Sequence, residues 1–361
     1  MSQINLLDLV CEKVKSLKAY HVETVEKGIK LHANESPYPP SPELTKNILA
    51  RFEKLDLNRY PDPDCKSLKE AISNRIGVHT NQLIIGNGSD ELIQGLMQVF
   101  CNEGDTIAFP DPTFAMYSIT AKGMGLNVHT FPLNKNWDFE ATPLIEKLHT
   151  SHARIVFISY PNNPTGNCFS RTEIQKLVEN FEGIVVLDEA YYDFSGLTFL
   201  NQMKDHNNLV ILRSLSKIGL AGLRVGYGIY PSTLVDEINK VRLPYNSNSI
   251  SQIAATELIN NFDIVQKQID SIKEERIRLL DKLSEIESIT TFPSNANFIL
   301  FQTSKNVEPV FRNLMENDVL VRNLGAHPRL KNCMRVTIGT IAENDQFLDQ
   351  LTKAIQQLAT D

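Results

Sequence analysis

The residue types with the clearest chemical potential gather around one lysine. Lys217 lies within Arg213-Ser-Leu-Ser-Lys-Ile-Gly-Leu-Ala-Gly-Leu-Arg224. A lysine amine forms Schiff bases with aldehydes, and Ser214, Ser216 and Arg224 offer two hydroxyls and a forked cation to a phosphate. Pyridoxal phosphate carries both an aldehyde and a phosphate, so the segment indicates a site for that cofactor. The alternative is an ordinary surface lysine, because most lysines are solvated.

A glycine turn supplies a second candidate phosphate contact. The segment Ile84-Ile-Gly-Asn-Gly-Ser-Asp-Glu-Leu92 combines a strand pattern, a turn and the start of an apolar helical stripe. Glycines let backbone amides approach a phosphate, and a helix N-terminus adds partial positive charge. The amides of Ser89 and Asp90 are therefore candidate ligands. The same residues would also serve as a plain helix N-cap.

Two further strand ends carry groups that suit a pyridine ring. Asn163 stands in a turn rich in proline after one apolar run, and its amide could bind a ring oxygen, although such turns also form without a ligand. Asp188 ends the buried run Ile184 to Leu187, where it could keep a ring nitrogen protonated. Tyr191 could reach the ring oxygen. An acid in this place could instead cap a helix or bind Mg²⁺, but the chain has no P-loop.

Alternating apolar runs and helical patterns predict the scaffold that brings these residues together. Short apolar runs separated by helical patterns predict an α/β fold with a mostly parallel central sheet and flanking helices. Ligands bind such sheets outside the carboxyl ends of the strands, which is where each candidate lies. The runs are Leu83 to Ile85, Thr106 to Phe109, Asn127 to Phe131, Ile155 to Ser159, Ile184 to Leu187, Leu209 to Leu212 and Val225 to Ile229.

The two ends of the chain predict further parts. An amphipathic helix is expected near the start, from Leu6 to Leu17, and a long helical region over roughly 250 to 285. Strand patterns at Asn297 to Phe301, Val319 to Val321 and Met334 to Ile338 predict a smaller α+β domain. We therefore expect an N-terminal arm over 1–34 joining the small domain, a large cofactor-binding domain over 35–245 and a small C-terminal domain over 246–361.

Composition narrows the classes of function. The net charge of −7 and pI near 5.7 argue against a nucleic-acid partner. The 5 cysteines are scattered, without the spacing of a metal site, so we expect no metal and free thiols in a reducing compartment. The first ten residues lack a signal-peptide pattern and no apolar run is long enough to span a membrane. These features predict a cytoplasmic protein with small-molecule substrates.

With these residues in view, the chain resembles the fold-type I pyridoxal phosphate aminotransferases over nearly its whole length. Within that family it is similar to the histidinol-phosphate aminotransferase subfamily. The motifs that carry the resemblance are Lys18-Ala-Tyr20, His32-Ala-Asn-Glu-Ser-Pro37, Asn58-Arg-Tyr-Pro-Asp62, Asp111-Pro-Thr-Phe-Ala-Met-Tyr117, Leu243-Pro-Tyr-Asn-Ser-Asn-Ser249, Val319-Leu-Val-Arg322 and Asn332-Cys-Met-Arg-Val-Thr-Ile-Gly-Thr340.

The resemblance implies roles for individual residues. Lys217 would be the Schiff-base lysine and proton shuttle, and Asp188 the partner of the ring nitrogen. Asn163 and Tyr191 would bind the ring oxygen. The cofactor phosphate would be bound by Ser214, Ser216, Arg224 and the amides of Ser89 and Asp90, with Tyr60 reaching in from the second subunit of a homodimer. Asn34 would belong to the substrate site.

Two features depart from the family pattern. Phe114 occupies the position of the ring that stacks on the cofactor, where tyrosine is more common; stacking survives this change but a hydroxyl contact does not. The interval from Lys217 to Arg224 is one residue shorter than in many relatives, which weakens the assignment of Arg224 to the phosphate.

Substrate choice depends on the C-terminal part of the chain. The resemblance implies that Arg335 binds the carboxylate of 2-oxoglutarate or glutamate, and that Arg335, Arg322 and Tyr20 bind the phosphate of histidinol phosphate. Ordinary salt bridges are the alternative for both arginines. The expected reaction is transamination between L-histidinol phosphate and 2-oxoglutarate in histidine biosynthesis.

Three other functions remain to be weighed. An aromatic amino-acid aminotransferase would need a pocket that differs by few contacts. A phosphothreonine decarboxylase would use the same scaffold for a lyase reaction. A regulator that only binds the cofactor is disfavoured, because no basic helix-turn-helix pattern precedes the catalytic motifs.

Overall fold

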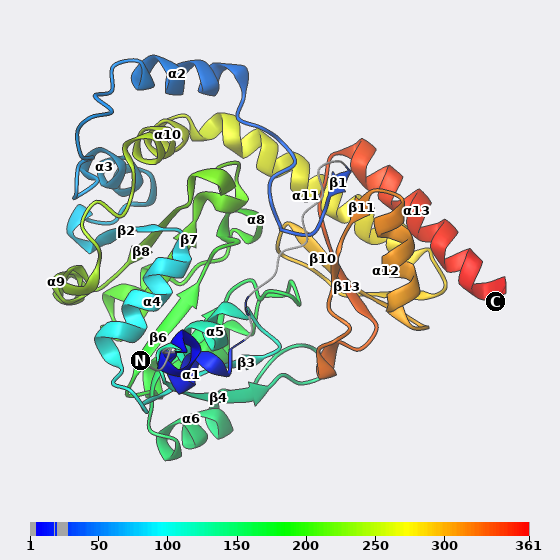
Figure 1. Ribbon diagram of the computed structural model, residues 1–361, viewed down its shortest axis with the longest axis horizontal. Coiled ribbons are helices and arrows are strands. Elements are labelled where there is room, and N and C mark those ends of the chain that lie inside the picture. The colour runs from blue at the N-terminus through cyan, green and yellow to red at the C-terminus, as the bar shows by residue number, and fades with distance from the viewer. Residues whose placement is uncertain (1–4, 18, 20–27, 361) are drawn as a thin grey trace.

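A mixed sheet forms the centre of the protein in the computed structural model, which describes residues 5–17, 19 and 28–360 (Figure 1). The sheet has seven strands in the order β2-β8-β7-β6-β5-β3-β4. Only β8 runs antiparallel to its neighbours. This confirms the mostly parallel sheet expected from the sequence. The strands are β2 Leu83–Asn87, β3 Thr106–Asp111, β4 Asn127–Pro132, β5 Ala153–Ser159, β6 Ile184–Asp188, β7 Leu209–Ser214 and β8 Val225–Ile229.

Helices cover both faces of this sheet, because its central strands are apolar on both sides. Alternate residues of β7 enter two different cores: Val210 packs with helices α4, α5 and α9, whereas Ile211 packs with residues of α3, α6 and α7. This alternation follows from the two-residue period of a strand. The helices are α3 Lys66–Ile76, α4 Ser89–Phe100, α5 Met116–Gly123, α6 Ala141–Thr150, α7 Arg171–Asn180 and α9 Ser232–Val241.

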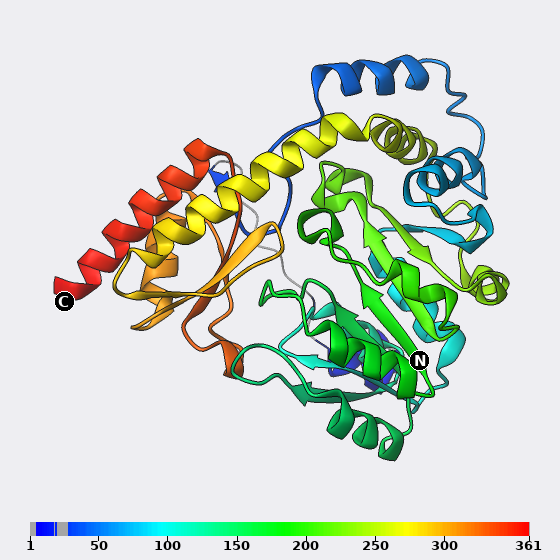
Figure 2. The ribbon, with the colours of Figure 1, turned by 180° about the vertical axis from the view of Figure 1, so that it is seen from behind.

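A second, antiparallel sheet lies beside the first, with order β12-β13-β10-β9 (Figure 1). Its strands are β9 Ile289–Thr291, β10 Phe298–Thr303, β12 Arg322–Asn323 and β13 Cys333–Thr337. The helices α11 Phe262–Ser284, α12 Val307–Glu316 and α13 Ile341–Thr360 accompany it. From the opposite side, α11 is seen to run from above the first sheet to the second (Figure 2). The division into domains at residues 34 and 245 remains a prediction.

Short elements complete the chain. The strand β1 Ile29–Lys30 pairs with β11 Val319–Leu320 in parallel. The others are α2 Pro42–Phe52, α8 Tyr192–Ser195, α10 Ser249–Asn260 and the 3₁₀ turns η2 Thr80–Gln82, η3 Leu200–Lys204, η4 Leu215–Lys217, η5 Ala221–Leu223 and η6 Pro328–Leu330.

The structure corrects the helix expected near the N-terminus. Near the N-terminus there is a 3₁₀ turn, η1 Leu6–Leu9, and a single turn, α1 Glu12–Lys15, instead of one helix, with Val10 extended between them. Leu6, Leu7 and Leu9 are exposed, and a short helix that buries no apolar face is marginal. The helical region expected over roughly 250 to 285 is present, as the two helices α10 and α11, which meet at Asn261.

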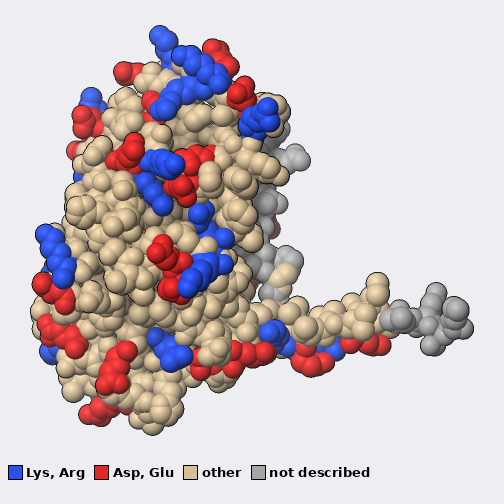
Figure 3. All heavy atoms as spheres, turned by 90° about the vertical axis from the view of Figure 1, so that its left-hand side faces the viewer, with Lys and Arg blue, Asp and Glu red and all other residues tan. Residues whose placement is uncertain are grey.

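Acidic and basic side chains are intermixed on the face shown in Figure 3, without a large area of one sign. In the described part of the chain, no helix is long and apolar enough to cross a membrane, and no cluster of His, Cys, Asp or Glu could hold a metal ion.

Candidate active site

One cavity gathers most of the residues that the sequence marked out. It has a volume of about 280 Å³ and lies where the carboxyl ends of β5, β6 and β7, the start of α4 and the strands β12 and β13 come together. Predicted residues that line it are Asn34, Ser89, Asp90, Phe114, Asn163, Asp188, Tyr191, Ser214, Ser216, Lys217, Arg224, Arg322 and Arg335. Their roles toward a ligand remain proposals.

Asp188 is buried at the end of β6 and faces this cavity. Burial raises the pKa of its carboxyl to about 6, although hydrogen bonds from Tyr117 and the Ala190 amide lower it. The Tyr117 hydroxyl donates to Asp188 Oδ2 over 2.8 Å, and the Ala190 N–H donates to Oδ1 over 3.2 Å. These donors fix the direction of the carboxylate and favour its ionised form, which is what a protonated ring nitrogen needs.

Lys217 follows β7, in the 3₁₀ turn η4, and is partly exposed to the cavity. Desolvation by the surrounding protein lowers the pKa of its amine to about 8, and the charge of Arg335 acts in the same direction. The amine nitrogen lies 5.8 Å from the centroid of the Tyr191 ring. A lysine with a lowered pKa has a larger neutral fraction near neutral pH, so it is a better nucleophile and proton acceptor.

A cradle for an anion lies at the N-terminus of α4. The guanidinium of Arg224 donates to Ser216 Oγ over 3.4 Å and pairs with Asp90 at 3.0 Å, and the Ser216 N–H donates to Ser214 Oγ over 3.1 Å. Gly88 has φ +80°, and a Cβ there would lie 2.7 Å from Arg224 Nη2. The short interval between Lys217 and Arg224 therefore still brings Arg224 to the cradle.

These features fit the phosphate of the predicted cofactor. The helix N-terminus, two hydroxyls and a guanidinium form a donor set suited to a phosphate. Gly226 lets β8 lie close to the start of α4, since a Cβ on Gly226 would come within 2.5 Å of the Ser89 nitrogen. The carboxylate of Asp90 lies near the same place, but its negative charge is balanced by Arg224.

Asn34 and Tyr191 join the N-terminal segment to the cavity wall. The Asn34 side-chain amide donates to the Tyr191 hydroxyl over 2.9 Å. Asn34 itself is buried in the left-handed region at φ 55°, and its backbone N–H donates to the Thr337 hydroxyl over 3.0 Å. The Tyr191 ring packs edge-on against Phe298. The orientation of the Tyr191 hydroxyl is therefore set by residues distant in the sequence.

Arg335 connects the second sheet to the first. Its Nη1 donates to Asn163 Oδ1 over 2.5 Å and its Nη2 to the carbonyl of His32 over 2.7 Å. Arg322 is its register partner on the neighbouring antiparallel strand, and both arginines line the cavity. Two guanidinium groups at one rim favour a ligand with an acidic group, such as a phosphate or carboxylate.

Two predicted residues are not placed at this cavity. The side chain of Tyr60 is exposed and stacks on Tyr245, with ring centroids 4.4 Å apart, beside a second cavity that Arg51 and Asp62 also line. Its proposed contact was with a second subunit, which a single chain does not test. Tyr20 lies outside the described residues, as does Lys18 of the same motif.

Other residues at or beside the cavity have no functional signal of their own in the sequence. Tyr117 is the hydroxyl donor to Asp188, and its spacing of three from Phe114 is the one sign of this role in the sequence. His32 and Thr113 also line the cavity. No local pattern distinguished His32 or Thr113 from neighbouring residues.

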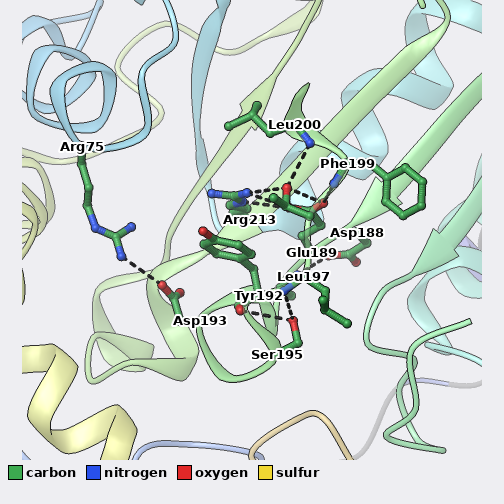
Figure 4. Close-up of polar contacts among 12 residues, drawn as sticks. Arg75, Asp188, Glu189, Tyr192, Asp193, Ser195, Leu197, Phe199, Leu200 and Arg213 are labelled. Carbon is green, nitrogen blue, oxygen red and sulfur yellow. Dashed lines mark hydrogen bonds and ion pairs between the residues drawn. The ribbon is translucent and has the colours of Figure 1, made fainter. Parts of the chain in front are cut away.

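A buried ion pair supports the site from behind (Figure 4). Arg213 donates to Glu189 Oε2 from Nε and Nη2, over 3.0 and 2.8 Å, and the side chains are 3% and 0% exposed. Glu189 also accepts from the Thr198 hydroxyl and the Phe199 N–H, each over 2.9 Å. Glu189 directly follows Asp188, and Arg213 directly precedes Ser214. Because neighbouring strand residues point to opposite faces, the pair braces the strand ends that carry the site.

Comparisons with known proteins agree with this geometry. The family model described as aminotransferase class I and II matches residues 26–351. A histidinol-phosphate aminotransferase of Aquifex aeolicus is 39% identical over 353 residues, which are 98% of this chain and 99% of that protein. One from Thermoanaerobacter sp. is 37% identical over 96% of this chain and 99% of its own length.

Solved structures share the fold. The crystal structure of histidinol-phosphate aminotransferase from Sinorhizobium meliloti in complex with pyridoxal-5'-phosphate has a TM-score of 0.89 at 22% identity, covering 97% of this chain and 98% of that one. The L-threonine-O-3-phosphate decarboxylase from Porphyromonas gingivalis has a TM-score of 0.79 at 22% identity, covering 92% and 99%. At such identities the likeness shows the fold alone. The match to the family model and the two curated relatives show that this chain belongs to the class I and II aminotransferases.

Proposed function

We propose that this chain is a pyridoxal phosphate-dependent aminotransferase that converts L-histidinol phosphate and 2-oxoglutarate into imidazole acetol phosphate and L-glutamate, reversibly, in histidine biosynthesis. The observation that carries the substrate is the register pair of Arg322 and Arg335 at the rim of the cavity that holds Lys217. Curated relatives of nearly full-length coverage bear the name of this activity.

Different residues of the cavity would bind different parts of the cofactor. When bound, pyridoxal phosphate supplies the aldehyde that takes up the amino group and a ring that accepts electrons from the substrate carbon. The cradle of Ser214, Ser216, Arg224 and the α4 amides would hold its phosphate. Asp188 would keep a proton on the ring nitrogen, and its contact with Tyr117 holds the carboxylate in place.

Two residues would orient the oxygen side of the ring. Asn163 and Tyr191 both line the cavity, and their positions are set by Arg335 and Asn34. Phe114, which also lines the cavity, has the flat apolar surface that a ring stacks on. The site would thus contact the cofactor at its phosphate, at the nitrogen and oxygen of its ring, and on one face of the ring.

Lys217 would move the proton. With a pKa near 8, about a tenth of its amine is neutral at pH 7, which suits an amine that must both donate and accept a proton at the substrate carbon. Arg335 would bind the acidic end of each substrate in turn, the phosphate in one half-reaction and the carboxylate in the other, and Arg322 would join it in binding the phosphate. Dual use of one anion site suits a ping-pong exchange.

The assembly and location complete the proposal. We propose a cytoplasmic homodimer in which Tyr60 of one subunit reaches the cofactor phosphate of the other. The exposed side chains of Tyr60, Leu57 and Leu243 support this, because they form apolar surface in the chain by itself. Tyr20 would contribute to the phosphate site of the substrate.

A half-reaction screen tests the proposal. The purified holoenzyme is mixed separately with histidinol phosphate, phenylalanine and phosphothreonine, and loss of the visible absorbance of the bound cofactor is followed. Rapid loss with histidinol phosphate alone is expected. A faster response to phenylalanine would indicate an aromatic aminotransferase, and release of carbon dioxide from phosphothreonine would indicate a lyase. The Lys217→Ala variant is the control that should respond to none.

A further inference from the structure

The segment between β12 and β13 reaches across to the first sheet. It covers residues 324–332 and includes the 3₁₀ turn η6. In Figures 1 and 2 this orange segment descends from the second sheet and lies beside the ends of β3 and β4. We call residues 324–330 the clasp loop. Leu324 of the clasp loop lines the cavity, as do Thr113 and Phe114 from the segment after β3.

The first contact is between His327 and Asp111. His327 Nε2 lies 3.0 Å from Asp111 Oδ1, at the last residue of β3. The other ring nitrogen, Nδ1, accepts a hydrogen bond from the Arg329 N–H over 3.2 Å. That bond assigns the proton of the neutral ring to Nε2, because one nitrogen accepts and the other must donate. His327 therefore presents a donor to the carboxylate without needing a positive charge.

The second and third contacts reinforce the first. Arg329 Nη2 donates to the carbonyl of Leu133, directly after β4. Leu330 of the clasp loop also belongs to an apolar cluster with the buried side chains of Leu300 and Cys333, against which Trp137 from the segment after β4 packs. The Trp137 ring lies edge-on to Phe292, with centroids 5.7 Å apart. A hydrogen bond between side chains, a hydrogen bond to a backbone carbonyl and an apolar cluster thus join the clasp loop to the end of β3 and to the segment after β4.

The ends of this connection lie close in sequence to the site. Asp111 precedes Thr113 and Phe114 by two and three residues, and Thr113 donates to Asn162 over 2.7 Å. On the other side, Leu324 follows Arg322 by two residues. A shift of the clasp loop would therefore move Arg322 relative to the Phe114 wall.

We propose that His327 and Arg329 are positioning residues that clasp the second sheet to the first and so place Arg322 over the cavity. They touch neither cofactor nor substrate. Their effect is on the distance between the anion-binding arginine and the wall that carries Phe114. The substrate used in the test rests on the proposed function, but the clasp itself does not.

The first test separates binding from chemistry. His327→Ala should raise the KM for histidinol phosphate about fivefold, the effect of one hydrogen bond, while kcat changes by less than about twofold. His327→Gln should restore most of the wild-type KM, because its side-chain amide can donate to Asp111 as Nε2 does. His149→Ala, on the exposed face of α6, is the control and should leave both constants unchanged. An unchanged KM in His327→Ala, or a failure of glutamine to rescue it, would refute the clasp.

A second measurement needs no substrate. Trypsin can cut after Arg322, Arg329 and Lys331, and cleavage within 322–332 of the holoenzyme is followed by mass spectrometry. His327→Ala and Asp111→Ala should each accelerate this cleavage several-fold, and the double variant should add little, because the two residues share one contact. Equal rates in all proteins would overturn the proposal. If wild-type enzyme is inactive toward histidinol phosphate but the cleavage rates change as stated, the proposed function fails and the clasp stands.

Discussion

Arg322 and Arg335 face each other as register partners on the antiparallel strands β12 and β13. Like charges in directly opposed positions destabilise a sheet. Both arginines line the cavity that also holds Lys217. A bound anion would stabilise this arrangement. We therefore propose that the acidic groups of the substrates bind beside these two arginines.

Replacing either arginine should weaken substrate binding in different ways. Arg335→Ala should raise the KM for both histidinol phosphate and 2-oxoglutarate, with kcat/KM falling about 10- to 100-fold, the effect of losing a charged hydrogen bond. Arg322→Ala should act mainly on histidinol phosphate. Arg322→Lys retains the charge without the planar fork and should recover only part of the loss. Steady-state kinetics with each substrate varied in turn measure these effects, and two unchanged KM values would make Arg335 a structural residue.

Lys217 should react in its neutral form, so its lowered pKa predicts a pH dependence. The rate at which cofactor-free protein captures the aldehyde covalently should rise with pH, with a midpoint near pH 8. Arg335→Gln removes a positive charge near the amine, so it should raise the pKa of Lys217 and move the midpoint to higher pH. The rate is followed by absorbance after mixing with pyridoxal phosphate. Lys217→Ala should show no covalent capture, and a rate independent of pH in the wild type would contradict this assignment.

The buried carboxylate of Asp188 should lower the free energy of unfolding of the cofactor-free protein above about pH 6. Its folded-state pKa of about 6 lies above the ordinary 3.8. The stability that its protonated form contributes is therefore fully present below about pH 4 and is lost as the pH rises through 6. Asp188→Asn should stabilise the cofactor-free protein at pH 8 by roughly 1 to 3 kcal/mol, with the gain shrinking toward pH 4.

The same variant should bind the cofactor less tightly and turn over more slowly, because an amide cannot hold a proton on the ring nitrogen. Thermal unfolding of the cofactor-free proteins at several pH values measures the first effect, and titration with pyridoxal phosphate the second. Equal stability of variant and wild type across this pH range would show that the carboxyl is not desolvated.

Replacements of Glu189 and Arg213 should have non-additive effects on the stability of the protein. Glu189→Gln or Arg213→Met leaves an uncompensated buried charge, which typically costs about 3 to 5 kcal/mol of the free energy of unfolding. The double variant should lose less than the sum of the two. Lys240→Ala breaks the exposed pair with Glu237 and should change stability by less than about 0.5 kcal/mol. Urea denaturation measures all four proteins, and strictly additive losses would show that the two charges do not interact.

Much of the fold and site could be predicted because the signals are local. A buried strand is a short apolar run, and the residue after it stands at the strand end, so Asp188 and Lys217 could be placed near each other from the sequence. Prediction failed where an element depends on partners. The stretch from Leu6 to Leu17 has helical periodicity, but Leu6, Leu7 and Leu9 are exposed, and only a 3₁₀ turn and a single α-helical turn form.

The sequence by itself determined the chemistry of the site, since residue type and position at a strand end identify a candidate lysine, carboxylate and phosphate cradle. Tertiary structure alone decided which side chains meet across the two sheets. Tyr117 donates to Asp188, Asn34 to Tyr191 and Arg335 to Asn163. These partners lie far apart along the chain, and no local period records which of the many possible long-range pairings brings two side chains within hydrogen-bonding distance. Packing of the second sheet against the ends of the first makes that choice.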